Sequence, residues 1–366
     1  MWPLDCFAAL AMTVENYSAS PEFGKAMTNQ AWSISRGFGI DKLQLEERPR
    51  REPGHGEARV RIERISLNRR DLLLVEGVYN PRQKLPIVPC SDAAGTVEAV
   101  GAGCGRVSVG DSVVIHFFPG WISGEPDMMK LGTALGGPGG DGALQQTIVI
   151  SEQALVRLPP EISTELASTL PCAALTAWSA VVAQGGVEPG SVVVTQGTGG
   201  VSLFALQFAK MLGTRVVATT SSEAKAAKLT ELGADGIVNY RNEPDWGRRV
   251  RELAGGAVDL IVEVGGAETL DASLRLIRPG GTRALIGVLS GAKASINLPL
   301  AVMRQVRLQG VTCGHRENFQ DMLRAIAARG VDPVISHRFP FPQAREAFRC
   351  MAENAHVGKI VIEAED

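Results

Sequence analysis

Residues 191–210 predict a strand, a glycine turn and the start of a helix, and this stretch constrains the fold more than any other. Residues 191–196 (SVVVTQ) form a short β-branched run that suits a strand buried on both faces. Glycines interrupt residues 197–202 (GTGGVS), and apolar residues then recur at helical spacing as far as Lys210. Such a turn directs unpaired backbone N–H groups and the positive end of a helix dipole at one point. The stretch is therefore predicted to bind a phosphate group.

The pattern is close to the G-x-G-x-x-G fingerprint of dinucleotide-binding folds, with Ser202 in place of the last glycine. That glycine normally permits close packing of the helix on the strand, and a serine is small enough to permit it too. A second strand-like run, residues 215–220 (RVVATT), follows at the distance expected in a βαβ unit. Together these features favour a dinucleotide site over an ordinary tight turn. We expect the cofactor phosphates at Gly197, Thr198, Gly199, Gly200 and Val201.

Charge and cysteine usage exclude several other classes of protein. With 37 Lys and Arg against 39 Asp and Glu, the net charge of -2 gives no reason to expect nucleic acid or a membrane as a partner. The six cysteines are widely spaced and contain no C-x-x-C pair, so they predict neither a disulfide framework nor a structural zinc site. We therefore expect a cytoplasmic protein that acts on a small-molecule substrate.

The 366-residue length favours two domains, preceded by a segment of different character. Residues 1–27 are expected to be a disordered or non-native extension. Their apolar run, residues 6–12, is not preceded by Lys or Arg as a signal peptide would require.

Residues 29–158 read as short strands separated by turns, which indicates a β-rich domain. Within it, the glycine-rich residues 119–142 are either a flexible loop or a lid that carries Trp121. From residue 191 onward, apolar strands alternate with helices, which is typical of a doubly wound parallel sheet. Two helices and a last strand, residues 359–363, are expected to return to the first domain.

The order of these parts resembles the medium-chain dehydrogenase/reductase superfamily. The resemblance is carried by motifs at residues 68–71 (NRRD), 77–79 (GVY), 89–95 (PCSDAAG), 110–111 (GD), 170–178 (LPCAALTAW), 263–266 (EVGG), 279–281 (PGG) and 358–361 (GKIV), together with the glycine fingerprint. It implies an α/β fold with a GroES-like β-rich catalytic domain over residues 28–172 and a Rossmann domain over residues 173–314. Residues 315–366 would then be the return to the catalytic domain.

Within that superfamily, the sequence is similar to the zinc-independent, quinone-oxidoreductase-like branch. The positions that correspond to the catalytic zinc ligands of alcohol dehydrogenases are Asn68, Ser91 and Cys172, and one thiol cannot hold a catalytic zinc ion. Residues 119–142, where a structural zinc lobe would lie, contain no cysteine. The resemblance therefore implies no zinc.

The resemblance also implies the residues that line the active site. Asn68 and Tyr79 are the candidates for hydrogen bonding to a substrate carbonyl, although Asn68 could only shape a turn and Tyr79 could only pack. Asp71 and Asp92 lie in matching motifs, where Asp71 could only cap a helix. The remaining cofactor contacts implied are Thr176, beside the nicotinamide, and Val264, Gly265, Gly287, Val288 and Leu289.

The end of the second Rossmann strand favours NADPH over NADH. NAD enzymes usually place an acid there for the ribose 2′-hydroxyl, whereas residues 219–222 (TTSS) carry only hydroxyls. Glu223 is expected to lie in the first turn of the next helix rather than to reach the ribose. Ser221, Lys225 and Tyr240 resemble the 2′-phosphate pocket of NADPH-using relatives.

These features predict an NADPH-dependent oxidoreductase that transfers hydride to a quinone, an enone or a similar carbonyl-activated substrate. Alcohol or aldehyde dehydrogenase activity of the same fold and a non-catalytic NADPH-binding protein remain as alternatives. A homodimer is expected, because residues 306–311 read as an edge strand that related proteins pair across a two-fold axis.

Overall fold

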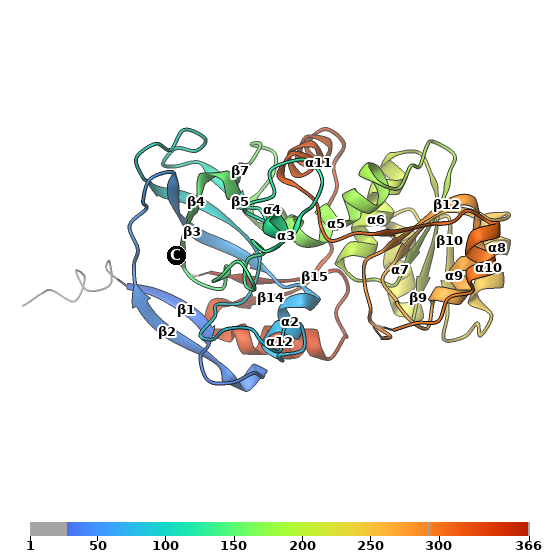
Figure 1. Cartoon of the computed structure of the whole chain (residues 1–366), viewed down its shortest axis with the longest axis horizontal. Coiled ribbons are helices and arrows are strands. Elements are labelled where there is room, and N and C mark those ends of the chain that lie inside the picture. The colour runs from blue at the N-terminus through green and yellow to red at the C-terminus, as the bar shows by residue number, and fades with distance from the viewer. Residues whose placement is uncertain (1–27, 292, 365–366) are drawn as a thin grey trace, which may run out of the picture.

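The computed structural model describes residues 28–291 and 293–364, which form two lobes (Figure 1). The lobe on the left of Figure 1 is β-rich, and the lobe on the right is an α/β layer structure. The extension expected over residues 1–27 lies outside the described residues.

A seven-stranded sheet forms the core of the β-rich lobe. The strands of this lobe are β1 (Thr28–Ile34), β2 (Leu43–Pro49), β3 (Glu57–Ser66), β4 (Asp92–Val100), β5 (Ser112–Ile115), β6 (Thr147–Ser151), β7 (Leu155–Arg157), β14 (Ile335–Pro340) and β15 (Lys359–Glu363). The main sheet runs in the order β14-β15-β3-β4-β5-β7, with β6 paired to β3 beside this path, and β1 pairs with β2 separately. Alternate residues of β3 are buried, as expected for a strand with one face on a core.

The second lobe contains a six-stranded sheet in which every neighbouring pair is parallel. Its strands are β8 (Val192–Gln196), β9 (Arg215–Thr220), β10 (Gly236–Asn239), β11 (Val258–Glu263), β12 (Ile277–Leu285) and β13 (Arg307–Gly310). The connecting helices are α6 (Gly200–Met211), α7 (Glu223–Glu231), α8 (Trp246–Ala254), α9 (Leu270–Leu276) and α10 (Leu298–Met303). The strand order is β10-β9-β8-β11-β12-β13, the doubly wound order of Rossmann folds. The predicted fold class is thus confirmed.

The strand order reverses beside the glycine turn. The chain builds the sheet outward from β8 to β10 and then crosses back to place β11 on the other side of β8. In open α/β sheets, ligands bind outside the carboxyl ends of the strands at the point where the order reverses. The turn that follows β8 lies at that point.

A broken helical segment joins the two lobes. It comprises α4 (Thr164–Ser168) and α5 (Leu175–Trp178), with π-helical turns at Leu170–Ala174 and Ser179–Ala183. Pro171 lies in the first of these turns, where a regular helix could not accommodate its ring. One buried apolar cluster extends through this segment from Phe117 of the β-rich lobe to Phe208 and Val262 of the α/β lobe. The lobes are therefore packed on a shared core.

The C-terminal residues return to the β-rich lobe. After α11 (Arg316–Arg329), the chain adds β14, α12 (Ala344–Ala352) and β15 to it. Strand β15 pairs antiparallel with β3 and parallel with β14. The sequence did not predict β14. Just before β15, Gly358 forms a parallel bridge with Gly199, so the two lobes also touch at the glycine turn.

Residues 119–142 are an anchored loop with one short helix, α3 (Met128–Leu131). Backbone N–H groups of Leu135 and Gly142 donate to the carbonyls of Phe117 and Val88. Trp121 is buried between Phe118 and His315, so its side chain packs in the core. Within the two described ranges of the chain, no helix has the length and apolar character that a bilayer span requires.

Candidate active site between the two lobes

The glycine turn after β8 leaves open space where a phosphate would lie. Gly197 has a φ of 76°, which favours glycine, and a Cβ atom added to Gly197 or Gly199 would meet no atom within 4 Å. Gly199 caps α6, a helix of 12 residues, without a side-chain hydrogen bond to its first N–H groups. Open space and uncapped amides at a helix N-terminus fit the pyrophosphate of a dinucleotide.

Ser202 occupies the place of the third fingerprint glycine without disturbing the packing. Its side chain is buried, and its hydroxyl donates a 2.6 Å hydrogen bond to the carbonyl of Gln196 at the end of β8. The hydroxyl is therefore satisfied within the strand–turn–helix unit, which explains why the fingerprint tolerates a serine here.

The other predicted cofactor residues follow the ends of neighbouring strands. Ser221 and Lys225 come after β9, Tyr240 after β10, Val264 and Gly265 after β11, and Gly287, Val288 and Leu289 after β12, while Thr198, Gly200 and Val201 lie on the turn after β8 and at the start of α6. Because the carboxyl ends of parallel strands meet at one edge of a sheet, the topology brings these residues to the same edge. Thr176 lies elsewhere, buried in α5, which packs against α6.

Lys225 follows the end of β9 and has no ion pair among the described residues. Its ammonium lies 3.2 Å from the carbonyl oxygen of Asn354 and 3.5 Å from that of His356. Glu223 is in the first turn of α7, and its carboxylate accepts hydrogen bonds from the side-chain amides of Asn239 (2.6 Å) and Asn242 (3.3 Å). This carboxylate is therefore held toward β10.

His356 lies among several positive groups near Lys225. Burial, together with the charges of Lys225, Lys359, His337 and Arg69, lowers the pKa of His356 to about 4. Its Nδ1 atom is buried and has no hydrogen-bond partner. An excess of positive charge at this edge fits the phosphates of a cofactor. The sequence did not indicate His356 or Arg69, because these residues are far from Lys225 in the chain and only the fold brings the three charges near one another.

A buried ion pair supports the turn after β11. The Glu263 carboxylate accepts hydrogen bonds from Arg283 (2.5 Å), Thr269 (2.6 Å), Ser273 (2.8 Å) and the backbone N–H of Gly265 (2.9 Å). Glu263 and Arg283 are both fully buried. Burial opposes ionisation, but the Arg283 charge and the hydroxyl donors outweigh it and lower the pKa of Glu263. The Glu263 carboxylate holds the backbone of Gly265 in position, and no local sequence pattern indicated the ion pair.

Asn68 lies at the N-terminus of α2 (Arg69–Val75), where Lys359 of β15 contacts it. The Lys359 ammonium donates to the Asn68 side-chain oxygen at 2.5 Å and to the carbonyl of Leu67 at 2.7 Å. The Asn68 backbone N–H donates to the Asp71 carboxylate at 2.8 Å, so Asp71 does cap this helix. The Asn68 Nδ2 group is buried without a partner.

Asp71 belongs to a buried charged cluster below Asn68. Burial raises the pKa of Asp71 to about 6, although the Arg70 guanidinium opposes the rise, and the Asp92 charge adds to it. The Arg70 guanidinium lies 3.1 Å from the Asp71 carboxylate. Asp92 in turn accepts hydrogen bonds from the Ser91 hydroxyl at 2.6 Å and the Cys172 backbone N–H at 3.0 Å.

Arg70 also ties the glycine-rich loop to Tyr79. Its guanidinium donates to the carbonyls of Leu135 (2.9 Å) and Gly136 (3.1 Å). It lies 5.0 Å from the ring centroid of Tyr79 and 5.0 Å from that of Phe117. Tyr79 itself is exposed. Arg70 was not predicted as a site residue, because an arginine inside a short helix is usually solvated.

The residues at the zinc-ligand positions do not fit a zinc ion. The side-chain oxygen of Asn68 faces an ammonium group, and the Ser91 hydroxyl donates to Asp92. Cys172 is the one thiol among the three, whereas a catalytic zinc ion normally takes three protein ligands. The described residues contain no group of three His, Cys, Asp or Glu side chains arranged to hold a metal.

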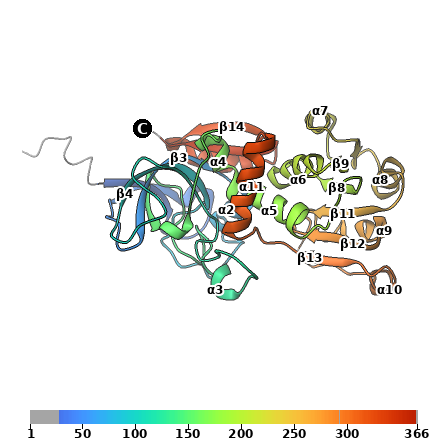
Figure 2. The same ribbon diagram turned by 90° about the horizontal axis from the view of Figure 1, so that it is seen from above.

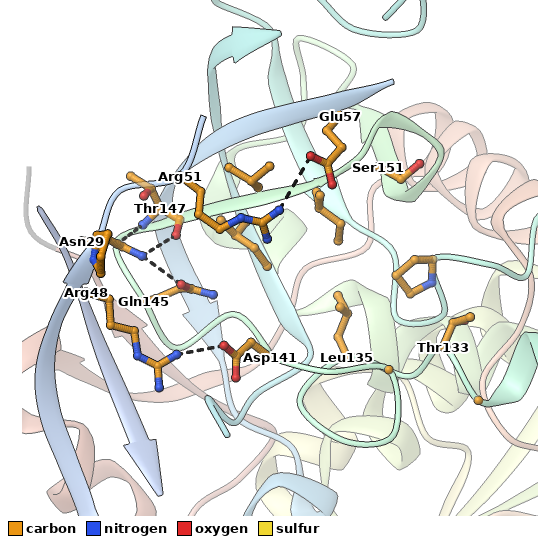
Figure 3. Close-up of a pocket in the computed structure, with 17 residues that line it drawn as sticks. Asn29, Arg48, Arg51, Glu57, Thr133, Leu135, Asp141, Gln145, Thr147 and Ser151 are labelled. Atoms are coloured by element: carbon orange, nitrogen blue, oxygen red, sulfur yellow. Dashed lines mark hydrogen bonds and ion pairs between the residues drawn. The ribbon is translucent and has the colours of Figure 1, made fainter. Parts of the chain in front are cut away.

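A pocket of about 460 Å³ lies on the β-rich lobe, away from these residues (Figure 3). Figure 3 shows Asn29 and Arg48, from β1 and β2, on the left, with Asp141 of the glycine-rich loop beside Arg48 and Thr133 on the right. Arg48 and Asp141 form an ion pair at 2.8 Å. None of the residues that line this pocket belongs to the predicted cofactor or catalytic set.

Comparisons with known protein families agree with this architecture. Residues 54–160 match the alcohol dehydrogenase GroES-like domain, and residues 200–328 match the zinc-binding dehydrogenase domain. The first match covers β3 to β7 of the β-rich lobe, and the second runs from the start of α6 into α11.

Individual relatives match nearly the whole chain. A zinc-type alcohol dehydrogenase-like protein from Schizosaccharomyces pombe is 37% identical over 88% of this chain and 96% of its own length. A chloroplastic quinone oxidoreductase, QR1, from Triphysaria versicolor is 29% identical over 89% of this chain and 95% of its own length. A solved structure from Sinorhizobium meliloti 1021, a candidate alcohol dehydrogenase, is 38% identical, with a TM-score of 0.85 over 92% of this chain and 99% of the other. The chain therefore belongs to the medium-chain dehydrogenase/reductase superfamily and is an NAD(P)-dependent oxidoreductase.

Proposed function

We propose that the protein is a zinc-independent, NADPH-dependent reductase of quinones, enones or similar carbonyl-activated substrates. Asn68 would be the catalytic hydrogen-bond donor, and Tyr79 would line the same cleft. The edge of the parallel sheet described above would hold the cofactor.

The observation that carries the proposal is the state of the Asn68 side chain. The side-chain oxygen of Asn68 already accepts a hydrogen bond from Lys359, while the Nδ2 group of Asn68 is buried and has no hydrogen-bond partner. Leaving a buried donor unsatisfied costs about 1–3 kcal/mol, so such a group is a natural place for an acceptor on a ligand. A carbonyl oxygen that gains negative charge during reduction is an acceptor of this kind.

In addition to this hydrogen bond, the chemistry requires one hydride ion and one proton. When bound, NADPH supplies the hydride and leaves as NADP⁺. A proton from water completes the reduced product, so no further oxidant or reductant is needed. The chain would bind the cofactor at the glycine turn, orient the substrate carbonyl through Asn68 and exclude water from the cleft.

The preference for NADPH is supported by the charges at the end of β9. The Lys225 ammonium donates to the carbonyls of Asn354 and His356, which leaves one proton for a ligand, and the nearby Glu223 carboxylate is hydrogen-bonded to Asn239 and Asn242. A 2′-phosphate would thus meet a cation and no opposing carboxylate, whereas a ribose 2′-hydroxyl would lack its usual acidic partner.

Alcohol or aldehyde oxidation is the second candidate, because the relatives named above include alcohol dehydrogenase-like proteins. In the alcohol dehydrogenases that the sequence resembles, zinc polarises the alcohol oxygen, and the donors found at Asn68, Ser91 and Cys172 do not suit that ion. This makes reduction of an already activated carbonyl compound the better supported activity.

A steady-state assay distinguishes these functions. Purified protein is incubated with an o-quinone, an enone and an aliphatic alcohol, each with both nicotinamide cofactors, while the cofactor absorbance is followed. The proposal predicts NADPH oxidation with the quinone or enone and little NADP⁺ reduction with the alcohol. A protein that binds NADPH but turns over none of these substrates would instead be a non-catalytic NADPH-binding protein.

A further inference from the structure

Lys359 occupies a position that connects the cofactor turn with Asn68. It is the first residue of β15, and the residue before it, Gly358, donates its backbone N–H to the carbonyl of Thr198 at 2.9 Å. The aliphatic part of the Lys359 side chain lies against the start of α6. A Cβ atom added to Gly200 would lie only 2.8 Å from Lys359 Cδ. The side chain is therefore packed against the turn that would hold the cofactor.

The ammonium group of Lys359 is buried and is bound only by oxygen atoms that carry no formal charge. It donates to the Leu67 carbonyl at 2.7 Å and to the Asn68 side-chain oxygen at 2.5 Å. Lys359 is 3% exposed, and no ion pair to it is found among the described residues. The Lys359 charge also acts on the nearby Asp71 carboxylate and opposes the rise in its pKa, so these oxygens and Asp71 together offset the cost of burying the ammonium.

The contact fixes which way the Asn68 amide faces. An ammonium can only donate, so the atom next to it must be the amide oxygen, and the NH₂ group must point the other way. That NH₂ group is the buried donor that has no partner. A charged donor on the oxygen also draws electron density from the amide and makes its NH₂ group a stronger donor.

We propose that Lys359 is a positioning residue that orients and polarises the Asn68 amide, so that Nδ2 donates to the substrate carbonyl oxygen. The inference rests on the proposed function, in which Asn68 is the donor. Lys359 acts through Asn68 and does not itself touch the substrate. Its packing on Gly200 also keeps the donor at a fixed position relative to the cofactor turn.

A purely structural role for Lys359 makes a different prediction. Through the Leu67 carbonyl, the ammonium also joins β15 to the loop before α2, so its loss could lower stability alone. In that case, the effect on turnover would not depend on whether Asn68 is present.

A double-mutant cycle separates the two roles. Asn68→Ala is expected to lower kcat for the quinone or enone by about 100-fold, a loss of the size seen for one oxyanion donor. Lys359→Met is expected to lower kcat by about 10-fold, with the KM for NADPH within about three-fold of wild type. In the Asn68→Ala background, Lys359→Met should change kcat by less than about two-fold. Equal effects of Lys359→Met in the two backgrounds would overturn the proposal.

Lys210→Met is the matched control for loss of a lysine. Lys210 also donates to a backbone carbonyl, that of Thr214, and pairs with Asp235 on the α/β lobe. It should leave kcat unchanged. Thermal unfolding of each variant shows whether the protein compared is folded.

A second readout does not depend on activity. In protein labelled with ¹⁵N-asparagine, the Asn68 side-chain signal is identified by its loss in Asn68→Ala. Lys359→Met is expected to shift this signal and to speed its exchange with water, whereas Lys210→Met should leave it in place. An unchanged Asn68 signal in Lys359→Met would overturn the proposal. If wild-type protein reduces no substrate, the proposed function fails, but the labelled spectra still decide whether Lys359 controls the Asn68 amide.

Discussion

The ammonium of Lys359 lies 2.5 Å from the side-chain oxygen of Asn68, across a sequence separation of 291 residues. The contact joins the last strand of the chain to the N-terminus of α2, beside the glycine turn of the parallel sheet (Figure 1). Three segments that are remote in sequence thus meet where the cofactor and the substrate carbonyl would lie.

Replacing Lys225 should reduce the preference for NADPH. Lys225→Met removes a charge-assisted hydrogen bond to the 2′-phosphate, so KM for NADPH should rise about 10-fold while KM for NADH stays constant. Lys228→Met is the control, because Lys228 is on the same helix and pairs with Glu231. Equal rises for NADPH and NADH in Lys225→Met would contradict the assignment of a phosphate contact.

Breaking the buried pair below the β11 turn should destabilise the protein. Glu263→Gln leaves the fully buried Arg283 without a counter-charge, which is expected to lower the free energy of unfolding by about 3–5 kcal/mol. Replacing both residues by methionine should restore much of that loss. The exposed pair of Asp271 and Arg275 gives the control, since Asp271→Asn should cost no more than about 0.5 kcal/mol. Urea unfolding measures all of these, and a loss below about 1 kcal/mol in Glu263→Gln would refute the stabilising role.

Acid should destabilise the protein through His116. This buried ring lies 2.8 Å from the Phe118 carbonyl oxygen and 3.2 Å from that of Gly314. Burial lowers the pKa of His116 to about 4, and the nearby Arg316 and His315 charges also lower it, although the two carbonyls oppose the shift. The unfolded chain therefore takes up a proton at a higher pH than the folded protein does.

The sign of the effect follows from that difference in protonation. The contribution of His116 to the free energy of unfolding is fully present above pH 6.5 and is lost as the pH falls toward 4. The loss should amount to about 2 kcal/mol between pH 7 and pH 5. His116→Gln cannot titrate, so its urea unfolding should show a correspondingly smaller loss over this interval. His356 also has a pKa lowered to about 4, so it still makes the free energy of unfolding fall with decreasing pH in the variant. The same loss in His116→Gln and wild type would exclude His116 as the source.

Strand β13 should mediate a homodimer. It ends the parallel sheet, and apolar side chains on it and on α10 are exposed, namely Leu308, Leu298, Val302 and Met303. Figure 2 shows β13 and α10 at the outer edge of the α/β lobe. Sedimentation velocity is expected to give a dimer for wild type and a monomer for Val302→Glu combined with Leu308→Glu. Met128→Glu, at an exposed apolar site on α3, should stay dimeric, and a wild-type monomer at micromolar concentration would contradict the prediction.

The sequence revealed the parts of this protein whose signals are local. The β-branched run of β8 and the glycine turn each occupy a few consecutive residues, and each strand and helix up to β13 has its own short pattern. The parallel sheet and its binding edge could therefore be predicted. Pro171 also indicated a break in the helical segment between the lobes, because a proline ring does not fit inside a regular helix.

The parts that could not be predicted depend on contacts between distant segments. Strand β14 has three consecutive polar residues (ISHRFP), so its sequence does not alternate as a half-buried strand would, and it is defined by its pairing with β15. Arg70 looks like a solvated helix residue until the glycine-rich loop is placed against it. The roles of Lys359 and Arg283 depend on their buried hydrogen-bond and ion-pair partners, which are distant in sequence and are not indicated by any local pattern.

Reduction by chelator-treated enzyme tests the central claim most directly. After dialysis against a zinc chelator and elemental analysis of the sample, NADPH oxidation is followed with an o-quinone and an enone, beside NADP⁺ reduction with an alcohol. We predict that the zinc-free protein reduces the quinone or enone at the rate of the untreated protein and that Asn68→Ala loses about 100-fold of this rate. Stoichiometric zinc whose removal abolishes activity, or turnover confined to the alcohol, would contradict the account.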